Sequence, residues 1–157
     1  MSPNHQGQLC HLVSLVVTTY NRPLKLRRMV TSAVNQTRPP HKIIVVNDGS
    51  TADYKDVKNW ALTLPNLLWI DQKNSGVSAA RNAGAQQVTT DYTCFCDDDD
   101  YWLDNHISSI EEGICKTNQP TILHTFRFDE NSKGELRPSK MIVKPTGLTW
   151  QEHYITS

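Results

Sequence analysis

The sequence lacks several features that mark particular classes of protein. Its 157 residues carry 16 basic and 16 acidic side chains, a formal net charge of zero, so no broad positive field attracts nucleic acid or an anionic membrane. No apolar run approaches the roughly 20 residues of a transmembrane helix. The first residues have neither the basic nor the apolar region of a secretory signal. We therefore expect a cytoplasmic protein without a transmembrane segment that binds no nucleic acid.

The cysteines and histidines show no pattern of a disulfide framework or a metal site. The four cysteines, Cys10, Cys94, Cys96 and Cys115, are too few and too scattered for a disulfide scaffold or a zinc site. Cys94 and Cys96 alternate with Phe95 in an apolar run, which is typical of small buried residues on one face of a strand. The six histidines show no metal-ligand spacing. We expect all four cysteines to be reduced.

Short apolar runs alternate with amphipathic segments from about residue 11 onward. The runs are rich in β-branched and other apolar residues, which predicts buried strands, and helical periodicity follows each run. These runs cover residues 12–18, 42–46, 67–70 and 92–96. The alternation is typical of βαβ units, so the sequence predicts an α/β fold with a mainly parallel sheet flanked by helices.

The pattern changes toward the C-terminus. Residues 121–128 and 136–143 predict two strands that are joined through the turn-forming residues 131–134, which is a β-hairpin signal. We expect this hairpin to extend the parallel sheet domain. The chain then divides into a flexible N-terminal tail, residues 1–10, and a single domain, residues 11–157.

Each of the four predicted parallel strands is followed by a polar cluster. The carboxyl ends of parallel strands meet at one edge of the sheet, where α/β proteins bind their ligands. The clusters are Thr18 to Asn21, Asp48 to Ser50, Asn74 to Arg81, and Asp97 to Asp100. Any one of them could be ordinary turn chemistry, but their convergence on one edge predicts a binding site.

Four consecutive aspartates, Asp97 to Asp100, are the sharpest of these features. Adjacent carboxylates repel one another after a buried strand unless a cation neutralises them. In an extended chain at most two of them share a side, which suits Mg²⁺ or Mn²⁺ held by one or two carboxylates and by substrate phosphates. The alternative is a solvated acidic loop that caps the next helix.

The other clusters also have two interpretations. Asp48 is either an Asx-turn or N-cap residue before Thr51 or an acceptor for a nucleobase N–H. Arg81 lies at the start of a predicted helix, where the helix dipole disfavours a cation, so we expect a phosphate or carboxylate partner. Asn21 is a candidate N-cap for the first helix. Four cations of that helix could attract an anion, but a solvated face is the preferred interpretation on an amphipathic helix; they are Arg22, Lys25, Arg27 and Arg28.

These clusters, in this order, resemble the family 2 glycosyltransferases, whose nucleotide-sugar-binding part has the GT-A fold. The matching stretches are VSLVVTTYNRP at 13–23, IIVVNDGST at 43–51, NSGVSAARNAG at 74–84 and FCDDDDYW at 95–102. The resemblance implies that this chain is the N-terminal donor-binding part of a larger catalytic domain and is truncated at its C-terminus. The segment TTYNRP after the first strand disfavours other phosphoryl enzymes and dinucleotide oxidoreductases.

The resemblance also implies roles for individual residues. Thr18 and Tyr20 line the uridine site, Asp48 contacts the base and Arg81 positions the nucleotide. Asp97 to Asp99 form the family's D-x-D motif, in which Asp98 lies near the ribose and Asp99 binds Mn²⁺ or Mg²⁺. The full set expected to bind the nucleotide-sugar is Thr18, Tyr20, Asn21, Asp48, Asn74, Gly76, Arg81, Asp97 and Asp98.

The implied reaction is metal-dependent transfer of a sugar, with inversion, from a UDP-sugar to an acceptor hydroxyl in glycan or polysaccharide biosynthesis. The acceptor, whether glycan, lipid-linked or protein, stays open. Asn47 stands where the family often has an acid. The family's general base lies well beyond the D-x-D motif, and Glu152, the last acid, lacks its surrounding motif. The alternative function is therefore a nucleotide-sugar-binding module without catalysis.

Overall fold

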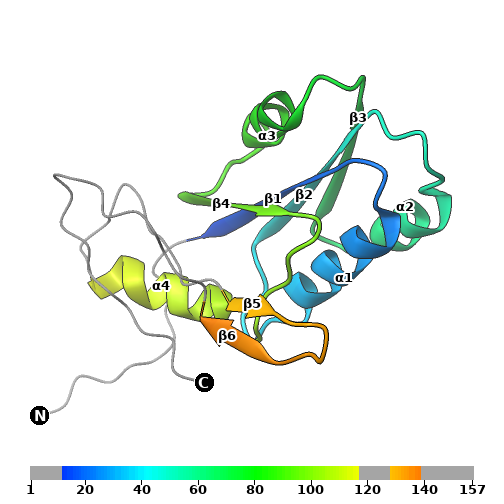
Figure 1. Cartoon of the computed structure of the whole chain (residues 1–157). Coiled ribbons are helices and arrows are strands. Elements are labelled where there is room, and N and C mark those ends of the chain that lie inside the picture. Colours follow the sequence, from blue (N-terminus) through cyan, green and yellow to red (C-terminus); the bar gives the residue numbers. More distant parts are fainter. Residues whose placement is uncertain (1–11, 117–127, 139–157) are drawn as a thin grey trace, which may run out of the picture.

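Four parallel strands form the centre of the fold (Figure 1). The computed structural model describes residues 12–116 and 128–138. Its strands are β1 (Val13–Thr19), β2 (Lys42–Asp48), β3 (Leu67–Gln72) and β4 (Tyr92–Asp97). They pair in the order β3-β2-β1-β4, and every pair is parallel. The predicted α/β fold and its mainly parallel sheet are confirmed.

Helices cover both faces of this sheet (Figure 1). They are α1 (Pro23–Val34), α2 (Lys55–Ala61), α3 (Val77–Ala85) and α4 (His106–Lys116). Side chains of α1, α2 and α4 share one apolar core with β1 and β2, whereas α3 supplies Ala80 to a second, smaller core on the opposite face. Parallel strands need such crossover helices because the end of one strand and the start of the next lie at opposite edges of the sheet.

Strand β1 lies between both cores, and all seven of its residues are buried. Val13, Leu15 and Val17 belong to the larger core, and Val16 belongs to the smaller one. Gly84 brings α3 close to this second face, because a Cβ there would lie 2.4 Å from Val16 Cγ1. Burial on both faces is why the strand reads as a continuous apolar run in the sequence.

A short antiparallel hairpin follows the parallel sheet along the chain. It consists of β5 (Phe128–Glu130) and β6 (Leu136–Pro138). Arg28 of α1 holds it by an ion pair, with Nη2 2.8 Å from Glu130 Oε2. The hairpin is confirmed. The remaining parts of its predicted strands, 121–127 and 139–143, lie outside the described residues, as do the predicted tail and Glu152, so the division into domains stays a prediction.

The cysteines differ in part from the prediction. Cys94 and Cys96 are free, as expected, and burial raises the pKa of each thiol to about 12. Cys115 is disulfide-bonded, so the prediction of four reduced cysteines is wrong for this residue. Within residues 12–116 and 128–138, no helix has the length and apolar character needed to cross a membrane.

Candidate functional site

The polar clusters meet at the carboxyl edge of the sheet, as the sequence predicts. The strand register places Thr18 beside Asp97, Thr19 beside Asn47, and Asp48 beside Gln72. Asp97 to Asp99 lie at the end of β4 next to the central strand β1. A hydrogen bond from Thr51 N–H brings Asn21 to the loop after β2, and the backbone of Asn74 lies against Gly49 in the same loop. The sheet therefore gathers residues from four loops into one candidate site.

Asp98 is the most buried of the aspartates, with 3% of its surface exposed. Thr19 Oγ1 donates a hydrogen bond to Asp98 Oδ2 at 2.7 Å, and Arg22 Nη1 lies 3.2 Å from Asp98 Oδ1. Burial raises the pKa of Asp98, while Thr19 and Arg22 oppose that rise by stabilising the charged form. Thr19 and Arg22 thus hold the two oxygens of this buried carboxylate at the carboxyl edge of the sheet.

Asp99 is the outer aspartate, and 42% of its side chain is exposed. Its Oδ2 accepts a hydrogen bond from Arg22 Nη1 at 2.6 Å, and Lys25 Nζ lies 3.9 Å away. Arg22 therefore contacts both Asp98 and Asp99, and the prediction that it belongs to a solvated helix face is wrong. Arg22 and Asp99 are 77 positions apart in the sequence, and the fold brings them into contact.

Asp99 fits the proposed role of metal ligand in its chemistry. Carboxylate oxygens are the hard ligands that Mg²⁺ and Mn²⁺ prefer. The Arg22 guanidinium already contacts Asp99 Oδ2, so this position favours a positive charge. No group of three or more acidic, histidine or cysteine side chains forms a metal cage in the described part of the chain. The donors suit Mg²⁺ or Mn²⁺ only if phosphate oxygens complete the coordination shell.

Arg81 lies in α3 and faces the first aspartate. Its Nη2 donates a hydrogen bond to Asp97 Oδ1 at 2.6 Å, which supplies the carboxylate partner that the sequence predicts. Its Nε–H is buried and has no hydrogen-bond partner in the described part of the structure. A buried N–H without a partner is costly, and this one belongs to a guanidinium that contacts Asp97.

Asp48 holds the loop that precedes α3. Its Oδ1 accepts from Ser75 N–H at 2.9 Å and from Gln72 Nε2 at 2.7 Å, while Oδ2 accepts from Gly76 N–H at 2.9 Å. The predicted turn role is thus real but concerns this loop, and Thr51 N–H pairs with Asn21 instead. A carboxylate offers about four acceptor positions, so one remains for a ligand.

Asn21 is a structural residue of the loop after β1. It has a left-handed backbone, with φ 57°, which asparagine tolerates. Its Oδ1 accepts from the N–H groups of Thr51 and Ala52 at 2.8 and 3.0 Å. The prediction that Asn21 is the N-cap of α1 is wrong, because Arg22 occupies that position and no side chain caps the helix.

Two glycines shape the same edge. Gly49 has φ +69°, and a Cβ there would lie 2.4 Å from the backbone nitrogen of Asn74, so this glycine lets the two loops touch. Gly76 has φ +87° and leads into α3 with open space around it. Thr18 is buried at the end of β1, whereas Tyr20 is 45% exposed. The positions of all the predicted residues are consistent with one site, but their contacts to a ligand stay predictions.

Tyr54, just before α2, is a site residue that the sequence analysis missed. Its hydroxyl lies 2.7 Å from Thr19 Oγ1 and accepts from Arg22 N–H, also at 2.7 Å. Tyr54 is buried in the larger core, with 6% of its surface exposed. The sequence offers one indication of this role: a buried tyrosine hydroxyl needs a hydrogen-bond partner.

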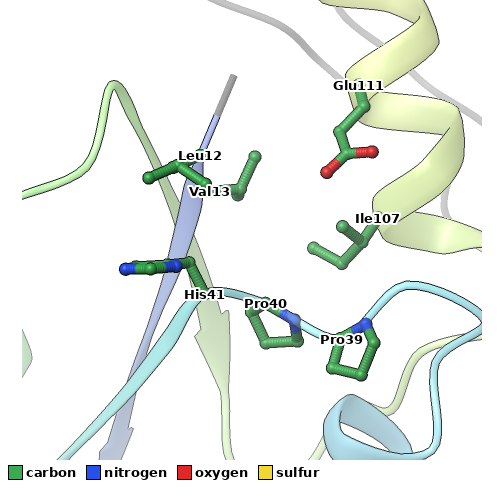
Figure 2. A pocket seen from close by; sticks show the side chains of 7 residues that line it. All are labelled: Leu12, Val13, Pro39, Pro40, His41, Ile107 and Glu111. Carbon is green, nitrogen blue, oxygen red and sulfur yellow. The ribbon is translucent and has the colours of Figure 1, made fainter. Parts of the chain in front are cut away.

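A small cavity lies at the other end of the sheet (Figure 2). Its volume is about 80 Å³, and none of the predicted site residues lines it. The lining residues are Leu12, Val13, Pro39, Pro40, His41, Ile107 and Glu111. Ligand pockets usually measure about 300 to 1,000 Å³, so this cavity is too small for a nucleotide-sugar.

The chain is similar to known proteins over most of its length. The family model described as Glycosyl transferase family 2 matches residues 14–156. The chain belongs to this family. Similar curated glycosyltransferases include YwdF of Bacillus subtilis, 38% identical over 65% of this chain and 38% of the relative. GlyA of Streptococcus pneumoniae is 34% identical over 78% of this chain and 18% of the relative.

Solved structures show the same fold. Staphylococcus aureus TarS has a TM-score of 0.63 at 24% identity, over 68% of this chain and 33% of that one. It was also solved with UDP and with UDP-GlcNAc. The mannosyltransferase PcManGT of Pyrobaculum calidifontis, in complex with GDP-Man and Mn²⁺, has a TM-score of 0.58 at 21% identity, over 64% of this chain and 32% of that one. This family 2 chain spans less than two fifths of the length of each of these relatives.

Proposed function

We propose that this family 2 chain binds a UDP-sugar together with Mn²⁺ or Mg²⁺ and that the protein transfers the sugar, with inversion, to an acceptor hydroxyl. The observation that carries the proposal is the Arg81 guanidinium, whose side chain is 41% exposed at the carboxyl edge of the sheet and whose Nη2 lies 2.6 Å from Asp97 Oδ1. A partly exposed guanidinium suits a phosphate oxygen. TarS complexes with UDP and UDP-GlcNAc support the choice of donor, and the PcManGT complex supports a divalent ion.

Each side chain has a proposed task in binding the donor. Arg81 donates to the diphosphate, Asp48 accepts a base N–H at its remaining acceptor position, and Asp98 accepts a ribose hydroxyl. Asp99 holds the ion, which supplies charge neutralisation at the diphosphate when it is bound. Thr18, Tyr20, Asn74, Gly76 and Asp97 border this donor site, and Asn21 fixes the loop beneath it.

The chemistry at the acceptor depends on a general base. The chain has no residue assigned to this role, and Glu152 lies outside the described residues. We keep the nucleotide-sugar-binding module as a second candidate function, because the residues that meet at the carboxyl edge of the sheet are those expected to bind the donor. A cytoplasmic location and a role in polysaccharide biosynthesis belong to the proposal.

Calorimetry with UDP and Mn²⁺ tests donor binding. We expect saturable UDP binding that depends on Mn²⁺, and we expect Asp99→Asn to weaken it by about tenfold or more. Asp91→Asn is the matched control, because Asp91 is an exposed aspartate at the opposite end of β4, where it accepts from Leu12 N–H. Unchanged UDP binding in Asp99→Asn would remove the metal assignment.

Arg81→Gln separates the phosphate role from a structural one. Loss of a charge-assisted hydrogen bond to phosphate is expected to weaken UDP binding by about tenfold to a hundredfold while leaving uridine binding unchanged. Equal weakening for uridine and UDP would contradict the assignment of Arg81 to the diphosphate. Release or transfer of sugar from UDP-sugars by the chain would then decide between the enzyme and the binding module.

A further inference from the structure

Tyr54 connects three elements that meet beneath the candidate site. The residue precedes α2, its ring packs edge-on against Trp69 with a centroid distance of 6.1 Å, and 6% of its surface is exposed. Its hydroxyl reaches Thr19 at the end of β1 and the backbone N–H of Arg22 at the start of α1. Thr19 in turn contacts Asp98 after β4.

The donors and acceptors fix the direction of this hydrogen-bond chain. Arg22 N–H can only donate, so the Tyr54 hydroxyl accepts it and has its own hydrogen to give. The threonine hydroxyl also has one hydrogen, which it donates to Asp98 Oδ2. Tyr54 Oη–H must therefore donate to Thr19 Oγ1. A reversed chain would leave the tyrosine hydrogen without an acceptor inside the core.

We propose that Tyr54 is a positioning residue that orients Asp98 through Thr19 for binding of the nucleoside diphosphate. This inference rests on the proposed function. Tyr54 reaches the Asp98 carboxylate only through Thr19, so its proposed role requires no contact with the ligand. It fixes the rotation of the Thr19 hydroxyl, which fixes Asp98 Oδ2, while Arg22 Nη1 lies 3.2 Å from the other oxygen, Oδ1. Such preorganisation improves affinity by reducing the entropy lost on binding.

The geometry distinguishes this role from simple core packing. Tyr54→Phe keeps the ring and its contact with Trp69 but removes the hydroxyl. The Thr19 hydroxyl then loses its donor and can rotate away from Asp98, while Arg22 N–H loses its acceptor. Thr19→Val removes the second link with little change of volume, and Thr19→Ser restores a hydroxyl at the same place.

The test measures UDP affinity in the presence of Mn²⁺ on the full chain. We expect Tyr54→Phe and Thr19→Val each to raise the dissociation constant by about threefold to tenfold, and Thr19→Ser to stay within about twofold of the unmodified chain. The controls are Tyr92→Phe and Thr90→Val, which change hydroxyl groups at the amino end of β4, where Thr90 Oγ1 contacts Ser14 and the Tyr92 carbonyl. We expect UDP affinity in both controls to be unchanged.

A double-mutant cycle tests whether Tyr54 acts through Asp98. In an Asp98→Asn background, Tyr54→Phe should change the UDP dissociation constant by less than about 1.5-fold, because the oriented group is already altered. The same loss in both backgrounds would overturn the inference, as would a fall in thermal stability with unchanged UDP affinity. If Tyr54→Phe does not fold, the Thr19→Val and Thr19→Ser pair decides the question alone.

The outcomes separate this inference from the function on which it rests. If the unmodified chain binds UDP and the Tyr54 and Thr19 variants bind it equally well, only the positioning role is overturned. If the unmodified chain binds no nucleoside diphosphate with or without Mn²⁺, the proposed function is overturned, and the positioning role falls with it.

Discussion

Replacing Asp48 by asparagine changes one atom and disturbs the loop before α3. The carboxylate accepts hydrogen bonds from three donors, Gln72 Nε2, Ser75 N–H and Gly76 N–H. Both of its oxygens are used, so an amide in either orientation turns its NH₂ group toward at least one N–H donor. The variant thus loses an acceptor and places a new donor against donors that need an acceptor.

The structure sets the size of this effect. A partly buried donor left without an acceptor costs about 1 to 3 kcal/mol. For a domain of this size, each kcal/mol corresponds to about 2 to 4 °C in the midpoint of thermal unfolding. A central value of about 2 kcal/mol therefore predicts a fall of about 4 to 8 °C for Asp48→Asn, together with weaker UDP binding.

Thermal unfolding followed by circular dichroism measures this fall. Asp53→Asn is the matched control, because the exposed Asp53 accepts a single hydrogen bond, from Lys55 N–H at 2.8 Å, which an amide oxygen can also accept. We expect the control to stay within about 0.5 kcal/mol of the unmodified chain. Equal midpoints for the two variants would refute the claim that the Asp48 carboxylate holds the loop.

Three other properties of the described residues can be checked independently. Gly84→Ala should lower the free energy of unfolding by about 1 to 3 kcal/mol in denaturant titrations, since the new Cβ would lie 2.4 Å from Val16 Cγ1, and an unchanged midpoint would contradict the close packing. Cys94 and Cys96, with pKa values of about 12, should resist alkylation at pH 8 in the native chain, as mapped by mass spectrometry, and rapid labelling of either would disprove their burial. Burial lowers the pKa of His106 to about 4. Between pH 6.5 and 4 this imidazole is protonated in the unfolded chain but neutral in the folded one. The free energy of unfolding should therefore fall by on the order of 3 kcal/mol as the pH is lowered through that range. The pH dependence should flatten in His106→Gln, and an unaltered dependence would assign the effect to other groups.

The sheet and its binding edge could be predicted because they follow from local patterns. A β-branched run such as residues 13–19 indicates a buried parallel strand, and the polar residues after each run must then gather at one edge. The same reasoning placed Asp48, Arg81 and the aspartates together. It required only periodicity and the geometry of parallel strands.

The pairing of side chains within the edge could not be predicted. Arg22 and Asp99 are 77 positions apart, and Thr19 and Asp98 are 79 apart, so their contact depends on the packing of α1 and β4 against β1. Asn21 has the residue type of an N-cap, but its left-handed backbone turns the side chain toward the loop after β2. Rotamers and loop conformations decide such contacts, and they leave no periodic signal in the sequence.

The position of β1 between β2 and β4 links the site to the folding of the molecule. The first strand of this sheet along the chain, β1, pairs with its last strand, β4, which closes a loop of 79 positions and carries an entropic cost. Thr19 and Asp98 meet only after this closure. A ligand held between the two strands therefore opposes complete unfolding and not merely local opening. At a hundred times its dissociation constant it would add about 2.7 kcal/mol to the stability of the whole sheet.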